Sequence, residues 1–260
     1  MKREKMRNGR QRGFSMLEML LVLGILSVVV GGIFAQMDQA QQRAYAERIK
    51  LDNMQEARDF VDQFFRDINE IGYPNVRMVD VTSPSWSPAL STPATYAWNN
   101  AYANDNRMAI GLVRIDNTEI RFEADTNGDG NVQSVRYTLN GNGNCALCVQ
   151  RSQVAKVSGD PLNAQPPNWG TEVNDALNAV IFTYFKADGT QISSASLPLD
   201  ISTLAGAQTL ASIKTIKISL TISNPIIKDI KTGKAIQTSF EGEVSLNNCS
   251  MATANQQTSC

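Results

Sequence analysis

The residues whose types and spacing best suggest chemistry lie at positions 125–131, which read Asp-Thr-Asn-Gly-Asp-Gly-Asn. Oxygen atoms of Asp125, Asn127, Asp129 and Asn131 stand at alternate positions, so a tight loop brings them together, and calcium prefers such ligands. The pattern is only the first half of a calcium loop, because Arg136 stands at the twelfth position, where a bidentate glutamate is needed. The same residue types also form ordinary turns between strands. We therefore expect either a truncated calcium site or a hairpin turn without a metal.

Four cysteines form a second candidate group: Cys145 and Cys148 in a C-x-x-C spacing, then Cys249 and Cys260. A zinc site is disfavoured, because the second pair lacks short spacing and no histidine assists. A thioredoxin-like motif is disfavoured because no strand–helix–strand pattern surrounds the pair. We expect structural disulfides, and three pairings are open. We prefer local pairing, in which Cys145 bonds Cys148 and Cys249 bonds Cys260. The first bond needs a turn at Cys145, because Cα atoms three residues apart on a strand are about 10 Å apart, too far for a disulfide.

Composition excludes several classes of function. The chain has 260 residues, enough for a membrane helix and one sizeable domain, and contains no histidine, so triads and histidine-ligated metals are absent. No P-loop and no pair of catalytic acids can be assigned, which predicts a protein that is not an enzyme. Without a basic leader at 1–13, which holds six of the 24 basic residues and one of the 25 acidic ones, the net formal charge is −6. Such a domain does not suit direct nucleic-acid binding.

Glu18 is the single charge in the 22 residues from Phe14 to Ala35. As a helix this run spans about 30 Å, the thickness of a bilayer's hydrocarbon, and the basic leader places its start in the cytoplasm. A secretory signal cut after the run, near Gly31–Ala35, is an alternative, and an uncleaved membrane anchor is another. Neither explains a carboxylate in an apolar helix, which is costly in a membrane and usually has a partner.

The segment Arg12–Glu18, Arg-Gly-Phe-Ser-Met-Leu-Glu, resembles the class III signal of type IV prepilins. That resemblance implies cleavage by a prepilin peptidase between Gly13 and Phe14, and methylation of the new Phe14 amine. It also implies that Glu18 pairs with the N-terminal amine of a neighbouring subunit during assembly. The implied partners are the peptidase, other pilins, the inner-membrane assembly platform and, before assembly, membrane lipid. Many pilins also close a C-terminal loop by a disulfide, which would fit Cys249 and Cys260.

The elements that must position these residues begin with one long helix. From Met37 to Ile71 apolar residues recur at spacings of three and four, except that Glu47 stands in the one gap between Ala44 and Leu51. No glycine or proline lies between 33 and 71, so we expect a helix from Phe14 to Ile71. Gly31–Gly32 is its expected soft point, and Gly72–Tyr73–Pro74 ends it. The phrase from Phe65 to Tyr73 resembles the helix end of PilW-like minor pilins and of J-type pseudopilins.

A β-rich part follows the helix. Asn75–Arg107 and Ser158–Asn174 are expected to be loops, because both are irregular and contain prolines. Strands are expected at Met108–Ile115, Thr118–Ala124, Asn131–Leu139, Cys148–Val157, Asn178–Lys186, Ile213–Ser223 and Ala235–Leu246. With no helices expected between them, the strands should form an antiparallel sheet. The fold class is therefore α+β and pilin-like, a long N-terminal helix packed on an antiparallel sheet domain.

These features predict four parts: a cleaved leader at 1–13, a transmembrane and assembly helix at 14–35, its amphipathic second half at 36–72, and a globular domain at 73–260. The resemblance implies a structural minor pilin, located in the inner membrane and then in a pilus or at the cell surface. A J-type pseudopilin of type II secretion and a membrane-anchored extracytoplasmic binding domain are the alternatives. Sequence alone does not choose among motility, DNA uptake, adhesion and secretion.

Overall fold

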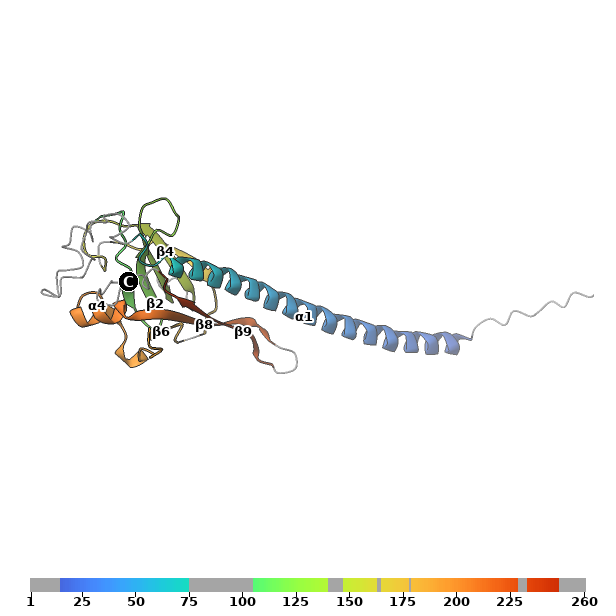
Figure 1. Ribbon diagram of the computed structural model, residues 1–260. Coiled ribbons are helices and arrows are strands. Elements are labelled where there is room, and N and C mark those ends of the chain that lie inside the picture. Colours follow the sequence, from blue (N-terminus) through green and yellow to red (C-terminus); the bar gives the residue numbers. More distant parts are fainter. Residues whose placement is uncertain are drawn as a thin grey trace, which may run out of the picture. The chain divides into compact units, whose positions relative to one another are not determined.

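The structure is a computed structural model, and it describes residues 15–74, 105–139, 147–162, 165–177, 179–228 and 233–247. The chain divides into two compact units, residues 1–48 and 49–260. Helix α1 (Met16–Asn69) runs through the boundary, and all other elements belong to the second unit. The fold is the expected α+β arrangement, in which the end of a long N-terminal helix packs on antiparallel sheets (Figure 1).

Helix α1 is regular over 54 residues, and it continues through Gly31–Gly32, the expected soft point. It ends close to the expected place. Gly72 has a φ of +75°, a left-handed conformation that glycine adopts without strain and that commonly terminates helices. The Gly72 N–H donates to the carbonyl of Glu123 at 3.1 Å, and the Asp125 N–H donates to the carbonyl of Tyr73 at 2.9 Å. The helix end is thereby fixed to the strand that precedes the 125–131 loop.

Two antiparallel sheets make up the second unit. The six-stranded sheet has the order β5-β4-β3-β2-β1-β7 and the three-stranded sheet the order β6-β8-β9. The strands of the first sheet are β1 (Leu112–Ile115), β2 (Glu119–Ala124), β3 (Gln133–Leu139), β4 (Val149–Ala155), β5 (Trp169–Val173) and β7 (Leu199–Asp200). The second consists of β6 (Phe182–Lys186), β8 (Ile213–Lys228) and β9 (Ala235–Ser245), and a short 3-10 helix η1 (Ser194–Ser196) and helix α4 (Leu204–Ala211) complete the unit.

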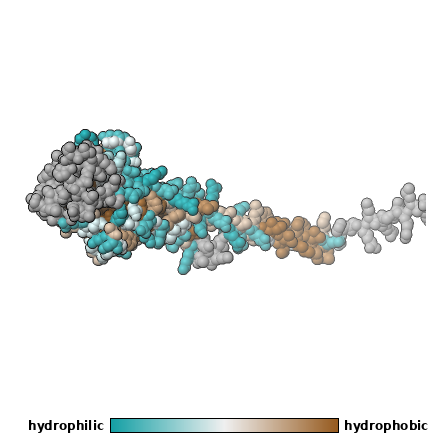
Figure 2. Space-filling view, in the orientation of Figure 1, coloured by the Kyte–Doolittle hydropathy of each residue, from teal (hydrophilic) through white to brown (hydrophobic). Residues whose placement is uncertain are grey.

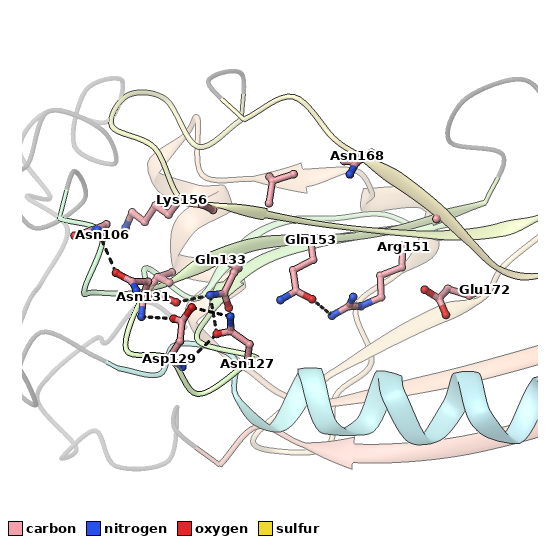
Figure 3. Close-up of a pocket in the computed structure, with 14 residues that line it drawn as sticks. Asn106, Asn127, Asp129, Asn131, Gln133, Arg151, Gln153, Lys156, Asn168 and Glu172 are labelled. Carbon is pink, nitrogen blue, oxygen red and sulfur yellow. Dashed lines mark hydrogen bonds between the residues drawn. The ribbon is translucent and has the colours of Figure 1, made fainter.

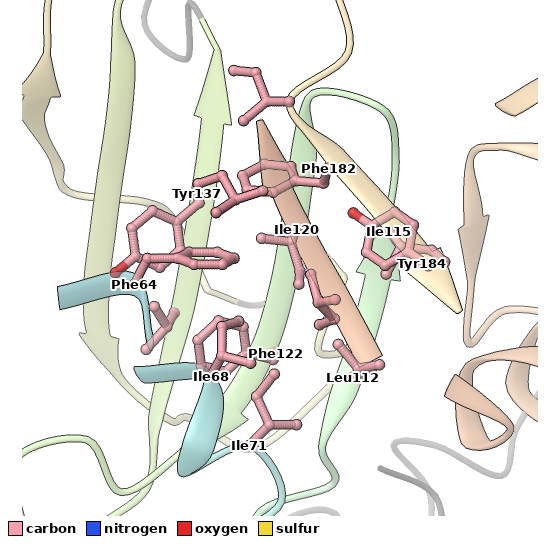
Figure 4. Packing of buried hydrophobic residues seen from close by; sticks show 14 of the residues in the cluster. Phe64, Ile68, Ile71, Leu112, Ile115, Ile120, Phe122, Tyr137, Phe182 and Tyr184 are labelled. Carbon is pink, nitrogen blue, oxygen red and sulfur yellow. The ribbon is translucent and has the colours of Figure 1, made fainter. Parts of the chain in front are cut away.

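The hydrophobic core joins the end of α1 to both sheets (Figure 4). The helix contributes Phe60, Phe64 and Ile68, whose spacing of four places them on one buried stripe. The Phe64 ring contacts Tyr137 of β3 edge-on, at 5.3 Å between centroids, and stacks on Phe182 of β6 at 5.4 Å. Because these two partners come from different sheets, the helix holds the sheets together as well as covering them.

All seven expected strands are present, but two expectations about the segments between them were wrong. Ser158–Asn174 contains β5, which pairs with β4 at the edge of the larger sheet, so it is not all loop. The prolines there lie before the strand and leave its N–H groups free to pair. The absence of helices between strands was also wrong, because α4 lies between β7 and β8. The Thr203 side chain caps α4 by accepting a hydrogen bond from the Gly206 N–H at 3.1 Å.

The long loop expected at 75–107 lies mostly outside the described residues, as do Trp86 and Trp98 within it. The described residues on either side of this segment are held by hydrogen bonds. The Ala109 N–H donates to the carbonyl of Pro74 at 2.8 Å. Beneath this contact lies a fully buried ion pair between Lys156 Nζ and Glu123 Oε2 at 2.8 Å. Lys156 also donates to the Met108 carbonyl at 2.7 Å, so both charges have hydrogen-bond partners. Pairing of this kind is what a buried charge requires.

Candidate functional site: the N-terminal motif and the anchored helix

The N-terminal motif opens helix α1. Gly13 and Phe14, the expected cleavage and methylation residues, lie outside the described residues, which begin at Ser15. The Ser15 carbonyl accepts hydrogen bonds from the N–H groups of Glu18 and Met19, at 2.9 and 3.1 Å. Glu18 therefore lies in the first turn of the helix, where a carboxylate interacts favourably with the helix dipole. Among the described residues, Glu18 has no ion-pair partner.

The helix behind Glu18 has an apolar surface that nothing in the described chain covers. Its large apolar side chains from Met16 to Phe34 are between 39% and 87% exposed. An 18-residue window has a mean hydropathy of 2.4 and none of it is buried, so this part is long and apolar enough to span a membrane. Figure 2 shows it as a continuous hydrophobic surface. Soluble monomers rarely expose so large an apolar patch, which indicates that lipid or other protein chains cover it.

The other end of α1 is anchored to the larger sheet by a buried polar network. Asp67, only 1% exposed, accepts hydrogen bonds through Oδ2 from the Tyr137 hydroxyl at 2.7 Å and from Arg151 Nε at 2.8 Å. Its other oxygen, Oδ1, accepts from Gln63 Nε2 at 2.6 Å. Arg151 Nε also lies 3.0 Å from the Tyr137 hydroxyl oxygen. Helix α1 is thus linked to β3 and β4 by a charge-assisted network of the stronger kind.

Burial governs the protonation of this network. It raises the pKa of Tyr137 well above its usual value, and the neighbouring Asp67 carboxylate raises it further. Burial alone would lower the pKa of Arg151, but Tyr137 and Asp67 beside it raise that pKa overall. The phenol is therefore neutral and donates, while the guanidinium is charged.

Sequence reasoning missed Arg151, which lies 84 positions from Asp67. The pairing of β3 with β4 places Arg151 opposite Tyr137, and the packing of α1 on the sheet brings Asp67 to both. A signal for Asp67 was available in the segment Phe65–Tyr73, whose resemblance to PilW-like minor pilins and J-type pseudopilins was used only to place the end of the helix. In the structure Asp67 of this segment binds Arg151, Ile68 enters the core and Gly72 ends the helix.

The 125–131 loop forms a compact connection between β2 and β3 (Figure 3). The Asp125 carboxylate accepts hydrogen bonds from three backbone N–H groups, of Gly128, Asp129 and Gly130, at 2.9 to 3.2 Å. Asp129 accepts from the Asn131 N–H at 2.8 Å and from the Asn127 amide at 2.8 Å. The loop is therefore closed by its own side chains, as in a hydrogen-bonded turn.

The four residues expected to hold calcium do lie together in this loop. The Asn131 N–H and the Asn127 amide lower the pKa of Asp129, so its carboxylate is charged at neutral pH. Only two of the four residues are carboxylates, and no group of three acidic, histidine or cysteine residues suited to a metal occurs in the described part of the chain. The oxygens now accepting hydrogen bonds would have to turn towards a cation. Calcium binding thus stays a prediction.

The cysteines are only partly described. Cys148, directly before β4, is disulfide-bonded. Its partner is not among the described residues, and Cys145, Cys249 and Cys260 all lie outside them. The preferred pairing of Cys145 with Cys148 therefore remains a prediction.

Comparison with known proteins identifies the N-terminal motif. Residues 8–34 match the family model of the prokaryotic N-terminal methylation motif. No curated protein and no solved structure matches the chain. The matched segment contains Gly13, Phe14 and Glu18, and it overlaps the exposed apolar part of α1. The motif therefore supports a type IV pilin-like protein, a pilin or pseudopilin that prepilin peptidase processes.

Proposed function

We propose that this chain is a structural minor pilin of the PilW type, incorporated into a type IV pilus as an assembly or tip component. The observation that carries the proposal is the methylation motif at residues 8–34, which includes the uncovered apolar surface of the helix. An apolar helix of this length is stable in a bilayer and, after extraction, in a fibre core made of similar helices. The chain would thus be an inner-membrane protein first and a pilus subunit afterwards.

Glu18 has the central role in this mechanism. Hydrolysis of the Gly13–Phe14 peptide bond creates a new amine four positions before Glu18. A methyl donor then transfers its methyl group to this nitrogen, which loses a proton. Near the middle of a bilayer an unpaired carboxylate costs about 2.5 to 3.5 kcal/mol, and less towards the helix end. The amine of a neighbouring subunit neutralises that charge and sets the axial position of the incoming helix. The lack of an ion-pair partner for Glu18 within the described chain is consistent with a partner from another subunit.

The anchor around Asp67 serves the same function from the other end of the helix. Because α1 runs into the globular unit, a load along the helix reaches residues 49–69 and then the sheets. Asp67, Tyr137 and Arg151 tie this part of α1 to two strands at once. A buried ion network and the aromatic contacts of Phe64 resist such a load together.

The test uses the full-length chain expressed in cells that assemble their own type IV pili. Mass spectrometry of the membrane-bound protein should find an N-terminus at Phe14 carrying one methyl group. Glu18→Ala should still be cleaved and membrane-bound but be lost from sheared surface fibres. Glu47→Ala, which removes a charge from an exposed position of the same helix, is the matched control and should enter fibres normally.

The outcomes separate the alternatives. A mature protein that starts at Met1 supports an uncleaved anchored binding domain, and one that starts after Ala35 supports a secretory signal. The J-type pseudopilin is supported by two results together. The protein is processed at Phe14, and deletion of its gene abolishes protein secretion but leaves surface fibres in place. Entry of Glu18→Ala into fibres at the level of Glu47→Ala would refute the role assigned to Glu18.

A further inference from the structure

A row of polar side chains crosses the whole six-stranded sheet on the face turned away from the core. In β2, Arg121 lies between Ile120 and Phe122, which are fully buried, so its side chain points to the opposite face. Residues paired directly across neighbouring strands share a face. The pairs run in order through Asp200, Arg114, Arg121, Arg136, Ser152 and Trp169.

Three arginines stand side by side in this row. Like charges directly opposite each other on a sheet are destabilising, so such a row needs anions. Glu119 supplies one, with its carboxylate 2.8 Å from Arg136 Nε, 3.4 Å from Arg121 Nη2 and 3.8 Å from Arg114 Nε. Asp200 supplies the other, 3.4 Å from Arg114 Nη1. Three positive and two negative charges leave the cluster with one net positive charge.

The arginines use only part of their hydrogen-bonding capacity. Arg121 Nη2 donates to Glu119 and Arg114 Nη1 to Asp200, each at 3.4 Å. Arg121 is 8% exposed, and its Nε is buried with no hydrogen-bond partner in the described part of the chain. Its Nη1 donates to the Leu162 carbonyl. Arg136 Nε lies close to Glu119 but is not aligned to form a hydrogen bond with it. Each guanidinium has five N–H donors, and a buried donor without an acceptor is unfavourable.

These side chains line a pocket of about 390 Å³, together with Leu162 and Asp200. That volume lies in the range of small-molecule sites and is several times that of a single carboxylate group. Burial, and then the charge of Arg136, lower the pKa of Arg121. A guanidinium nevertheless keeps its positive charge in proteins. The pocket is therefore a concave, cationic site.

We propose that this pocket binds a carboxylate group of a ligand, seated on Arg114 and Arg136 above Arg121. One negative charge neutralises the cluster, whereas a phosphate dianion would overcompensate it. The planar guanidinium fork matches a carboxylate in two parallel hydrogen bonds, and the cluster already holds two carboxylates of the chain itself. The site lies in the globular unit, so the proposed binding does not depend on whether the chain is a pilin.

The carboxylate can come from a small acid, such as a sugar acid, or from an acidic side chain of a peptide. Calorimetric titration of the full-length chain in neutral detergent distinguishes the two. The probes are glucuronate with glucose as its neutral match, and N-acetylglutamate amide with N-acetylglutamine amide as its neutral match. Inorganic phosphate is the third probe. We expect saturable binding of at least one acid and none of its neutral match.

Two variants and a control locate the site. Arg114→Gln should weaken the binding of the acid about tenfold or more, the loss expected for a hydrogen bond to a charged group. Arg107→Gln removes the same charge from an exposed arginine outside the pocket and should bind as the wild type does. Glu119→Gln removes the competing internal carboxylate and should tighten binding by about tenfold.

Binding of glucuronate alone assigns a small acid, and binding of N-acetylglutamate amide alone assigns an acidic side chain. The proposal is overturned if neither acid binds better than its neutral match, or if phosphate binds more tightly than both. It is also overturned if Arg114→Gln and Arg107→Gln bind the acid equally, or if Glu119→Gln weakens binding. If Arg114→Gln does not fold, the affinity of Glu119→Gln for the acid still decides the question, because the proposal requires that affinity to rise.

Discussion

Replacing Asp67 by asparagine tests the anchor between α1 and the larger sheet. Asparagine has the same shape but no charge, so Arg151 loses its ion-pair partner while the core stays filled. Removing one member of a buried ion pair destabilises a protein by about 3 to 5 kcal/mol. The Arg151 side chain is 15% exposed and Asp67 is 1% exposed, so water screens the guanidinium a little. We therefore expect a loss near the lower value, about 3 kcal/mol.

For a unit of this size each kcal/mol shifts the melting temperature by roughly 2 to 4 °C, so the variant should melt about 6 to 12 °C lower. The assay is unfolding of the full-length chain in neutral detergent, followed by the circular dichroism of its β-structure. The control is Glu241→Gln at the exposed pair with Lys217, whose atoms also lie 2.8 Å apart. An exposed pair contributes at most about 1 kcal/mol.

A double-mutant cycle shows whether the loss arises from the pair itself. Asp67→Asn and Arg151→Met together should cost less than the sum of the two single changes, because each single change leaves the other charge unpaired. A coupling of about 1.5 kcal/mol or more is expected for direct contact. Strict additivity, or a loss from Asp67→Asn no larger than that from Glu241→Gln, would refute the anchor.

Three further predictions concern two buried tyrosines, the 125–131 loop and the cysteines. Burial raises the pKa of Tyr137 and of Tyr184, so the folded state holds these protons more tightly than the unfolded chain. The contribution of these two groups to the free energy of unfolding should be constant from neutral pH to about pH 10 and fall above it, and Tyr184→Phe should reduce that fall. An equal decline in both proteins would contradict this. Millimolar calcium should raise the melting temperature of wild type but not of Asp129→Ala, and no rise in wild type would leave only a turn. Non-reducing peptide mapping should find Cys249 linked to Cys260, and free thiols or bound zinc would exclude structural bridges.

The long helix could be predicted from the sequence because its signals are local. The apolar run from Phe14 to Ala35 and the spacing of three and four beyond it both require a helix, and Gly72 ends it. Most strands were also predicted, since their β-branched residues alternate. The edge strand β5 has only five residues, one of them a glycine, and helix α4 is only eight residues long, so neither produces a clear periodic pattern.

The contacts that define both the anchor and the arginine pocket could not be predicted, because they depend on register. Arg114, Arg121 and Arg136 are spaced by 7 and 15 positions, and no motif links them. They share a row only because β1, β2 and β3 pair so that Arg121 faces Arg114 on one side and Arg136 on the other. A slip of one residue between two strands would turn one guanidinium into the core, against Ile120 and Phe122. The turns that join the strands fix that register, and the 125–131 loop is one of them, so a loop first noticed as a calcium motif also determines where the arginines meet.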